Sequence, residues 1–327
     1  MSGADEPEVA EDARIARLRA RFDRSPRDPA VALAIGDDAA LAHGLALSVD
    51  VAVEDVHFRR SFAPLAALAE RAANAALSDL AAMGATPTGL LLALLVPRDE
   101  PPASFDALAE GVAKAAEAAG AAVLGGNLSR GHALSLTTTV LGRAPESPLR
   151  RDGARPGDGI WVTGAPGDAA LGLARLMAGE REGPFIARWL HPRPRLGAGR
   201  ALLGHASAAM DLSDGLLLDL GRMTGASGVG ATIRLADIPR GPGFAAAAGA
   251  DARALLLGGG ESYELLFTAR GDVPSPLEAT RIGTIDAAPG LRVDAGAGPD
   301  PVVPAGHDHF SAFPPAAPSA RPKAERE

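Results

Sequence analysis

The sequence predicts an α+β protein built from two α/β domains. Apolar runs with the spacing of strands alternate with helical patterns along most of the chain. The chain has 327 residues, which at about 150 residues per domain favours two domains. Residues 144–158 hold three prolines, two glycines and three arginines, a sharp change in composition that is typical of a domain junction.

This junction sets the expected domain limits. We expect an N-terminal domain over residues 14–148 and a C-terminal domain over residues 149–311. Residues 1–13 and 312–327 are rich in Pro, Ala and charge without periodicity, so we expect them to be loose tails.

The elements of the first domain follow from periodicity and from turn residues. A short helix is expected where Ile15, Leu18 and Phe22 recur at helical intervals, and a long helix ends at Gly84. In order, we expect a helix at 11–23, strands at 31–35 and 45–53, a helix at 64–84, a strand at 89–96, a helix at 103–119, and strands at 122–125 and 133–141.

The second domain shows the same alternation. In order, we expect a strand at 159–163, helices at 169–178 and 184–203, a strand at 208–212, a helix at 215–224, and strands near 231–235, 263–269 and 280–285.

Composition excludes several classes of function. Apolar residues make up 47% and charged residues 22%, as in globular proteins, and a net charge of -8 is the wrong sign for binding nucleic acid. The absence of cysteine excludes disulfides, thiolate metal sites and a cysteine nucleophile.

The N-terminus has no basic and apolar leader, and the longest apolar run, 90–96, is far shorter than the ~20 residues that cross a bilayer. We therefore expect a cytoplasmic protein without a membrane span.

Aspartates end several apolar stretches. They are Asp37, Asp38, Asp50, Asp79, Asp211 and Asp214. Each one alone is explained equally well as a turn former or a helix N-cap. Asp79 is harder to explain, because it interrupts an apolar helix in which an uncompensated charge is costly to bury. Together the aspartates indicate a Mg²⁺ site that handles phosphates, since Mg²⁺ prefers oxygen ligands.

The sequence excludes one kind of phosphate-binding site and offers two candidates for another. A P-loop is excluded, because neither lysine, Lys114 or Lys323, lies in a Gly-Lys-Ser/Thr loop. The segment 125–131 follows an apolar strand and offers glycines and Arg130 to phosphates, although a plain hairpin turn explains the glycines equally well. Arg151 at the domain junction has two possible interpretations. It could bind phosphates, or it could simply belong to an exposed basic linker.

Two further residues are candidates for ligand contacts. Glu261 follows three glycines at a strand start, where it is well placed to face a ligand, although the same pattern fits a plain strand start with Tyr263 as a buried ring. His57 follows Asp50, and a structural histidine is the more common meaning of such an isolated residue.

The order of the motifs resembles that of thiamine-monophosphate kinase, a family related to aminoimidazole ribonucleotide synthetase and selenophosphate synthetase. The motifs are Ile35-Gly36-Asp37-Asp38-Ala39, Ser48-Val49-Asp50, His57-Phe58, Leu77-Ser78-Asp79-Leu80-Ala81-Ala82-Met83-Gly84-Ala85, Gly125-Gly126, Asp211-Leu212-Ser213-Asp214-Gly215-Leu216, Gly259-Gly260-Glu261 and Asp308-His309-Phe310. The resemblance covers about residues 15–310.

The resemblance implies two domains of the aminoimidazole ribonucleotide synthetase type, with N-terminal sheets that pair across a homodimer. It implies transfer of phosphate from ATP, the co-substrate, to thiamine monophosphate. Several Mg²⁺ ions, bound with ATP in a cleft that reaches the C-terminal domain, assist the transfer without a catalytic side chain. The implied metal residues are Asp37, Asp38, Ser48, Val49, Asp50, Asp79, Asn127, Asp211 and Asp214. The implied ATP contacts are Gly126, Asn127, Arg151 and Ser213, and the implied substrate contacts are His57, Glu261 and His307.

The chain departs from the family pattern at several of these positions. Asn127 and Val49 replace an aspartate and a threonine, Ala76 and Ser262 replace an asparagine and an aspartate, and Leu128 and His307 also differ. Losing the negative ligand at Asn127 weakens a Mg²⁺ site, so a slow kinase is expected. The alternatives are a catalytically impaired nucleotide-binding paralogue, or a kinase or synthetase of the same superfamily with another substrate. Selenophosphate synthetase and the hydrogenase-maturation member are set aside because they depend on cysteine or selenocysteine.

Overall fold

The computed structural model describes residues 11–22, 28–271, 273, 277–303, 306 and 307. Contacts divide the chain into two units. One comprises Met1–Ser25 with Asp308–Glu327, and the other is Pro26–His307. The described part of the first unit is helix α1 (Glu11–Phe22), which confirms the helix expected there. The tail at 312–327 and the motif at 308–310 lie outside the described residues.

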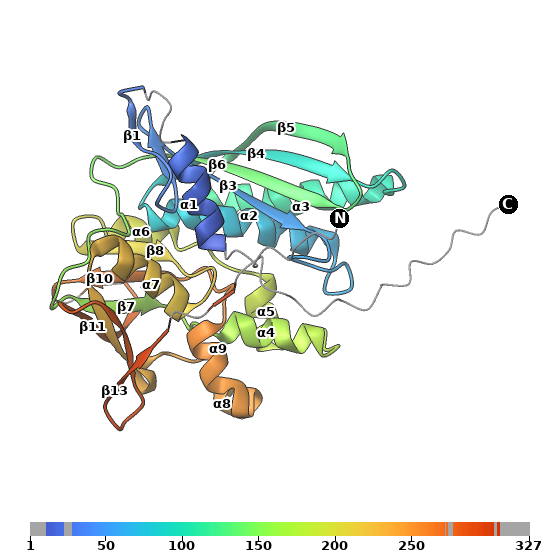
Figure 1. Cartoon of the computed structure of the whole chain (residues 1–327). Helices are drawn as coiled ribbons and strands as arrows, with labels where there is room; N and C mark the ends of the chain where they lie inside the picture. The colour runs from blue at the N-terminus through green and yellow to red at the C-terminus, as the bar shows by residue number, and fades with distance from the viewer. Residues whose placement is uncertain (1–10, 23–27, 272, 274–276, 304–305, 308–327) are drawn as a thin grey trace, which may run out of the picture. The chain divides into compact units, whose positions relative to one another are not determined.

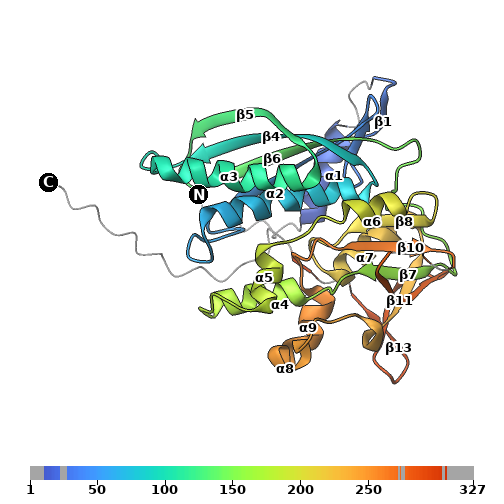
Figure 2. The same cartoon turned by 180° about the vertical axis from the view of Figure 1, so that it is seen from behind.

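The first half of the larger unit is a six-stranded sheet backed by two helices. The strands, in spatial order, are β1 (Val31–Leu33), β2 (Ala40–Ala42), β3 (Leu45–Val53), β6 (Ser135–Arg143), β4 (Thr86–Val96) and β5 (Ala122–Arg130). Neighbours are antiparallel except β4 and β5, which are parallel. Helices α2 (Leu65–Ala82) and α3 (Pro102–Ala119) cover one face of this sheet (Figures 1 and 2).

The second half contains a seven-stranded sheet. Its order is β13 (Pro299–Val302), β12 (Gly290–Asp294), β9 (Gly230–Arg234), β11 (Ala279–Asp286), β7 (Gly159–Thr163), β10 (Leu265–Ala269) and β8 (Ala206–Asp211). Only β9 and β12 pair in parallel. Its helices are α4 (Asp168–Met177), α5 (Pro184–Leu190), α6 (Leu196–Ala201), α7 (Leu216–Ser227), α8 (Phe244–Ala248) and α9 (Ala252–Gly258), with short 3₁₀ turns at Leu235–Asp237 and Gly249–Asp251. The predicted class of two α/β domains is confirmed, while the boundary at 148/149 remains a prediction.

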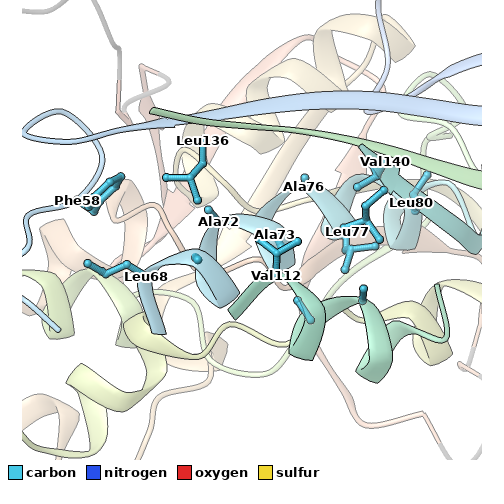
Figure 3. Packing of buried hydrophobic residues seen from close by; sticks show 14 of the residues in the cluster. Phe58, Leu68, Ala72, Ala73, Ala76, Leu77, Leu80, Val112, Leu136 and Val140 are labelled. Carbon is cyan, nitrogen blue, oxygen red and sulfur yellow. The ribbon is translucent and has the colours of Figure 1, made fainter. Parts of the chain in front are cut away.

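Helix α2 is buried on almost every side, which explains its apolar composition. Leu77 and Leu80 are fully buried among the side chains of the first sheet, including Val140 (Figure 3). Its last residues, Ala81 and Ala82, pack instead with the core of the second sheet. A helix that contacts apolar cores on opposite sides has no free polar face, so any charged side chain on it must have a partner.

Two sequence expectations about local structure are wrong. The helix expected at 184–203 is two helices, α5 and α6, because Pro192 and Pro194 interrupt the backbone between them. The glycine segment 125–131 is not a hairpin turn, since strand β5 continues through Arg130 and pairs with β4, while its contact with phosphates remains a prediction. Hydrogen bonds to a neighbouring strand outweigh the local flexibility of two glycines.

No helix among the described residues is long and apolar enough to cross a bilayer.

Candidate active site

Three aspartates from separate segments meet at one point. Asp38 lies in the loop before β2, Asp79 lies on α2, and Asp211 ends β8. Carboxylate oxygens of all three lie within 4.8 Å of one another. The buried helix α2 creates this cluster, because it contacts both sheets and carries Asp79 between them.

Strand β3 contributes side chains to the cluster from the face of the sheet that α2 and α3 cover. Ser48 Oγ donates a hydrogen bond of 2.6 Å to Asp79 Oδ2. Asp50 shares the alternation of Ser48, and its Oδ1 accepts a hydrogen bond of 2.7 Å from the main-chain N–H of Val51. Val49 points to the opposite face and is 62% exposed. A valine side chain has no ligand atom, so Val49 could contact an ion only through its main-chain carbonyl.

Arg151 joins the loop between the sheets to this cluster. Its Nη2 donates to Asp38 Oδ1 at 2.7 Å, and its Nε lies 3.5 Å from Asp37 Oδ1. Its side chain is only 19% exposed, so the interpretation of residues 150–151 as an exposed linker does not apply to Arg151. Asp37 also accepts main-chain N–H groups of Asp38 and Arg151, and therefore supports the loop instead of joining the three clustered carboxylates.

The electrostatics of the cluster favour a bound cation. Burial raises the pKa of Asp38 to about 8 and that of Asp211 to about 7, with the charges of nearby aspartates adding to the effect. Burial also raises the pKa of Asp79 well above its usual value. Asp38 Oδ2 is buried and has no hydrogen-bond partner among the described residues. Hard oxygen donors, carboxylates that repel one another when ionised and an unpartnered carboxylate oxygen fit Mg²⁺.

We expect the stability of the metal-free protein to fall as the pH rises from about 5 to about 8. Carboxyls with a raised pKa bind protons in the folded state that the unfolded chain has released above its pKa of 3.8, so deprotonation favours unfolding. Mg²⁺ binds the ionised carboxylates, and its stabilising effect should therefore be larger at about pH 8 than at about pH 6. Thermal unfolding with EDTA or with Mg²⁺ measures both trends. A metal-free melting temperature that rises over this range would contradict this account.

Asp214 lies beside the cluster in a separate ion-pair network. Its carboxylate pairs with Arg222, which also contacts Asp219 at 3.2 Å. Asp219 is fully buried and accepts hydrogen bonds of 3.1 Å from the main-chain N–H groups of Asp214 and Gly215. Burial raises the pKa of Asp219 to about 7. Asp219 is not among the aspartates predicted from the sequence, although an acidic residue in the first turn of a helix, here α7, is a recognisable helix-start signal.

Each of the three candidate substrate contacts, His57, Glu261 and His307, makes a hydrogen bond with a main-chain group. The main-chain N–H of Val53 donates to His57 Nδ1 at 3.1 Å, which leaves the proton of a neutral ring on Nε2. The main-chain N–H of His307 donates to the carbonyl oxygen of Asp214 at 2.8 Å, and Glu261 N–H donates similarly to the carbonyl oxygen of Ser213 at 2.7 Å. Ser213 thus joins the aspartate loop to the glycine segment that carries Glu261.

Glu261 is anchored by residues that the sequence analysis did not identify. Its Oε2 accepts hydrogen bonds from Arg71 of α2 and from Trp189 Nε1 of α5, the latter at 3.1 Å. Glu261 also has a left-handed backbone, with φ of 70°. Arg71 could have been identified by the reasoning that singled out Asp79, because it too is a charge within an apolar helix.

The structure does not bring Gly126 and Asn127 to the cluster. They lie on β5, at the edge of the sheet and three strands from β3, which corresponds to about 14 Å at the usual strand spacing. Both residues are exposed.

The chain matches known proteins over both halves. The N-terminal domain of the AIR synthase related proteins matches residues 36–144, and their C-terminal domain matches residues 155–295. The thiamine-monophosphate kinase of Salmonella typhimurium (strain LT2) is 43% identical over 249 residues, which cover 72% of this chain and 75% of that protein. This chain belongs to the thiamine-monophosphate kinase family.

Other members of the thiamine-monophosphate kinase family support the same assignment. The protein of Aquifex aeolicus (strain VF5) is 34% identical over 289 residues, which cover 84% of this chain and 92% of that protein. A solved structure described as AaThiL complexed with AMPPCP and TMP superimposes with a TM-score of 0.85 at 30% identity, covering 95% of this chain and all of that one. The resemblance identified from the ordered motifs is confirmed.

Proposed function

We propose that this protein transfers the γ-phosphoryl group of ATP to thiamine monophosphate, forming thiamine diphosphate. The observation that carries the proposal is the cluster of Asp38, Asp79 and Asp211, with its unpartnered carboxylate oxygen. It occurs in a chain whose fold matches a structure that holds an ATP analogue and TMP. ATP is the co-substrate, and we propose the cytoplasm as the location because ATP is made available there.

The proposed reaction needs no general base. The terminal phosphate of the acceptor has a second pKa of about 6 and is largely a dianion at neutral pH. The protein must therefore align two anionic groups and reduce their repulsion. Asp38, Asp79 and Asp211 would hold Mg²⁺, with Ser48, Asp50, Asp37 and Asp214 as nearby supports or additional ligands. Bound Mg²⁺ supplies the positive charge that neutralises the phosphates.

Other residues of the site receive complementary roles in this proposal. Arg151 is placed to donate to ATP phosphates once a metal ion replaces it at Asp38, and Ser213 lies in the adjacent loop. His57, Glu261 and His307 would contact thiamine monophosphate. Gly126 and Asn127 remain proposed ATP and metal contacts, although within one chain they lie apart from the cluster. The main-chain carbonyl of Val49, next to Ser48, remains a proposed metal contact.

The test is formation of thiamine diphosphate from thiamine monophosphate and Mg-ATP, with the wild type measured beside Asn127→Asp. Turnover by the wild type would establish the kinase and show that Asn127 is tolerated. Activity only in Asn127→Asp would favour the impaired paralogue, which lacks one negative ligand. No product from either protein, with ATP still bound, would favour another acceptor.

We propose further that the protein is a homodimer that pairs through the first sheet. No helix of the described residues 28–307 covers the face opposite α2 and α3, and large apolar side chains on it are exposed: Val49, Val51, Leu91 and Leu95. The edge strand β5 adds Leu124, which is 57% exposed and lies over Gly89 of the neighbouring strand. A soluble monomer rarely exposes so continuous an apolar surface, and a second copy of the chain offers a matching one.

We expect Leu91→Glu to convert the dimer to a monomer. Leu91 lies near the middle of the open face and is 38% exposed, so a charge there is tolerated by the free chain but costly once a partner excludes water. Sedimentation velocity of both proteins measures the mass. A wild type that stays monomeric at micromolar concentration would overturn the proposal. Ala109→Glu, on the exposed side of α3, adds the same charge away from the open face and serves as the control.

A further inference from the structure

A buried arginine connects the metal-carrying helix to the candidate substrate loop. Arg71 lies on α2, two turns before Asp79, and is only 5% exposed. Its guanidinium donates to Glu261 and to the main-chain carbonyl of Trp189, and it lies 4.0 Å from the centre of the Trp189 ring. The ring of Tyr263 lies 5.5 Å away on the same cation. Burying a guanidinium costs free energy unless its charge is compensated. The partners of Arg71 therefore indicate that this side chain has a specific role in the site.

The contacts with Glu261 are confined to one of its two carboxylate oxygens. Arg71 and Trp189 both donate to Oε2, and within the described residues Oε1 accepts no hydrogen bond. The side chain of Glu261 is 29% exposed, so Oε1 can be reached by a ligand. Two donors on one oxygen hold the carboxylate in a single orientation while the second oxygen stays free to accept a hydrogen bond.

The charge of this carboxylate selects the part of the substrate that it can contact. A carboxylate repels phosphate groups, whereas the organic half of thiamine monophosphate carries a positive thiazolium ring and an amino group that donates hydrogen bonds. We propose that Arg71 and Trp189 are positioning residues that hold Glu261 against this cationic half of the substrate. The inference rests on the proposed function and adds two residues to the site.

A purely structural role for Arg71 and Trp189 is the competing explanation. It predicts that their replacement lowers stability or affects both substrates alike. Positioning of Glu261 instead predicts a selective effect on thiamine compounds, and no further effect once the carboxylate of Glu261 has been removed. The two explanations therefore differ in which ligand responds and in whether the substitutions are additive.

The test uses Trp189→Phe, which keeps an aromatic ring under Arg71 but removes the N–H that donates to Glu261. The chain holds two tryptophans, and Trp161→Phe is the matched control, because Trp161 Nε1 is buried without a hydrogen-bond partner among the described residues. Trp161 is stacked on Phe267, and a phenylalanine preserves that contact. Binding of thiamine monophosphate and of thiamine is measured by calorimetry, and KM for each substrate is measured in the kinase assay.

We expect Trp189→Phe to weaken binding of thiamine and of thiamine monophosphate by about tenfold, as for loss of one hydrogen bond to a charged group, with KM for ATP unchanged. Arg71→Lys keeps the positive charge but loses the planar arrangement of N–H donors. It should also weaken the binding of both thiamine compounds selectively. Trp189→Phe in a Glu261→Ala background, which removes the acceptor, should add nothing.

Two results would overturn the inference separately from the proposed function. If the wild type forms thiamine diphosphate but Trp189→Phe binds thiamine compounds as Trp161→Phe does, positioning is wrong and the kinase assignment stands. Equal weakening of ATP and thiamine monophosphate, or full additivity with Glu261→Ala, would also overturn it. A wild type that binds neither thiamine compound would overturn both proposals.

Discussion

Asp79→Asn should lower kcat by about 10³-fold or more, the range found when a single group that stabilises transferring charge is removed. The side chain keeps its size, and Ser48 can still donate to the amide oxygen, but the cluster loses one of three negative ligands. The substitution should leave the fold intact. Because burial raises the pKa of Asp79, a neutral amide removes repulsion within the metal-free cluster, and its melting temperature should equal or exceed that of the wild type.

The measurement combines steady-state kinetics with thermal unfolding in EDTA and in Mg²⁺. Asp106→Asn, on the exposed side of α3, makes the same chemical change away from the site and should leave both readouts unchanged. Unchanged turnover in Asp79→Asn would sink the assignment of this cluster. A lower melting temperature in EDTA would contradict the electrostatic account of the cluster.

Gly199→Ala should destabilise the protein by about 2–3 kcal/mol, although alanine is the better helix former. Gly199 lies on α6, and a Cβ atom at this position would lie 1.9 Å from the carbonyl oxygen of Ala81 at the end of α2. The main chain at Ala81 cannot move away from this Cβ atom unless α2 shifts, and α2 carries Asp79 between the two sheets. We therefore expect activity to fall together with stability.

Gly197→Ala is the matched control for Gly199→Ala. It lies on the same helix, and a Cβ atom there meets nothing within 4 Å. It should be neutral or stabilising by up to about 1 kcal/mol, from helix propensity alone. Unfolding in urea gives both free energies. Equal values for the two variants would show that the contact between α6 and α2 does not limit stability.

Part of the site could be predicted from the sequence because the signals are local. An aspartate next to buried apolar residues, at a strand end as at Asp211 or within a helix as at Asp79, needs a partner for its charge. The sequence therefore indicated an oxygen-rich metal site, and the ordered motifs indicated the family. The same reasoning applied to Arg71 would have marked it as well, since a buried guanidinium on that helix also requires a partner.

By itself, the sequence determined the class of fold, most helices and strands, and the carboxylates that form the cluster, because periodicity and residue chemistry act within a few neighbouring positions. Only the tertiary structure decided which of them meet. Glu261 reaches Arg71 across 190 positions of the chain, and Asn127 lies on an edge strand away from the cluster. The physical reason is that strand order and helix packing depend on burying apolar faces of distant segments together, and this global requirement leaves no local pattern at the residues that it joins.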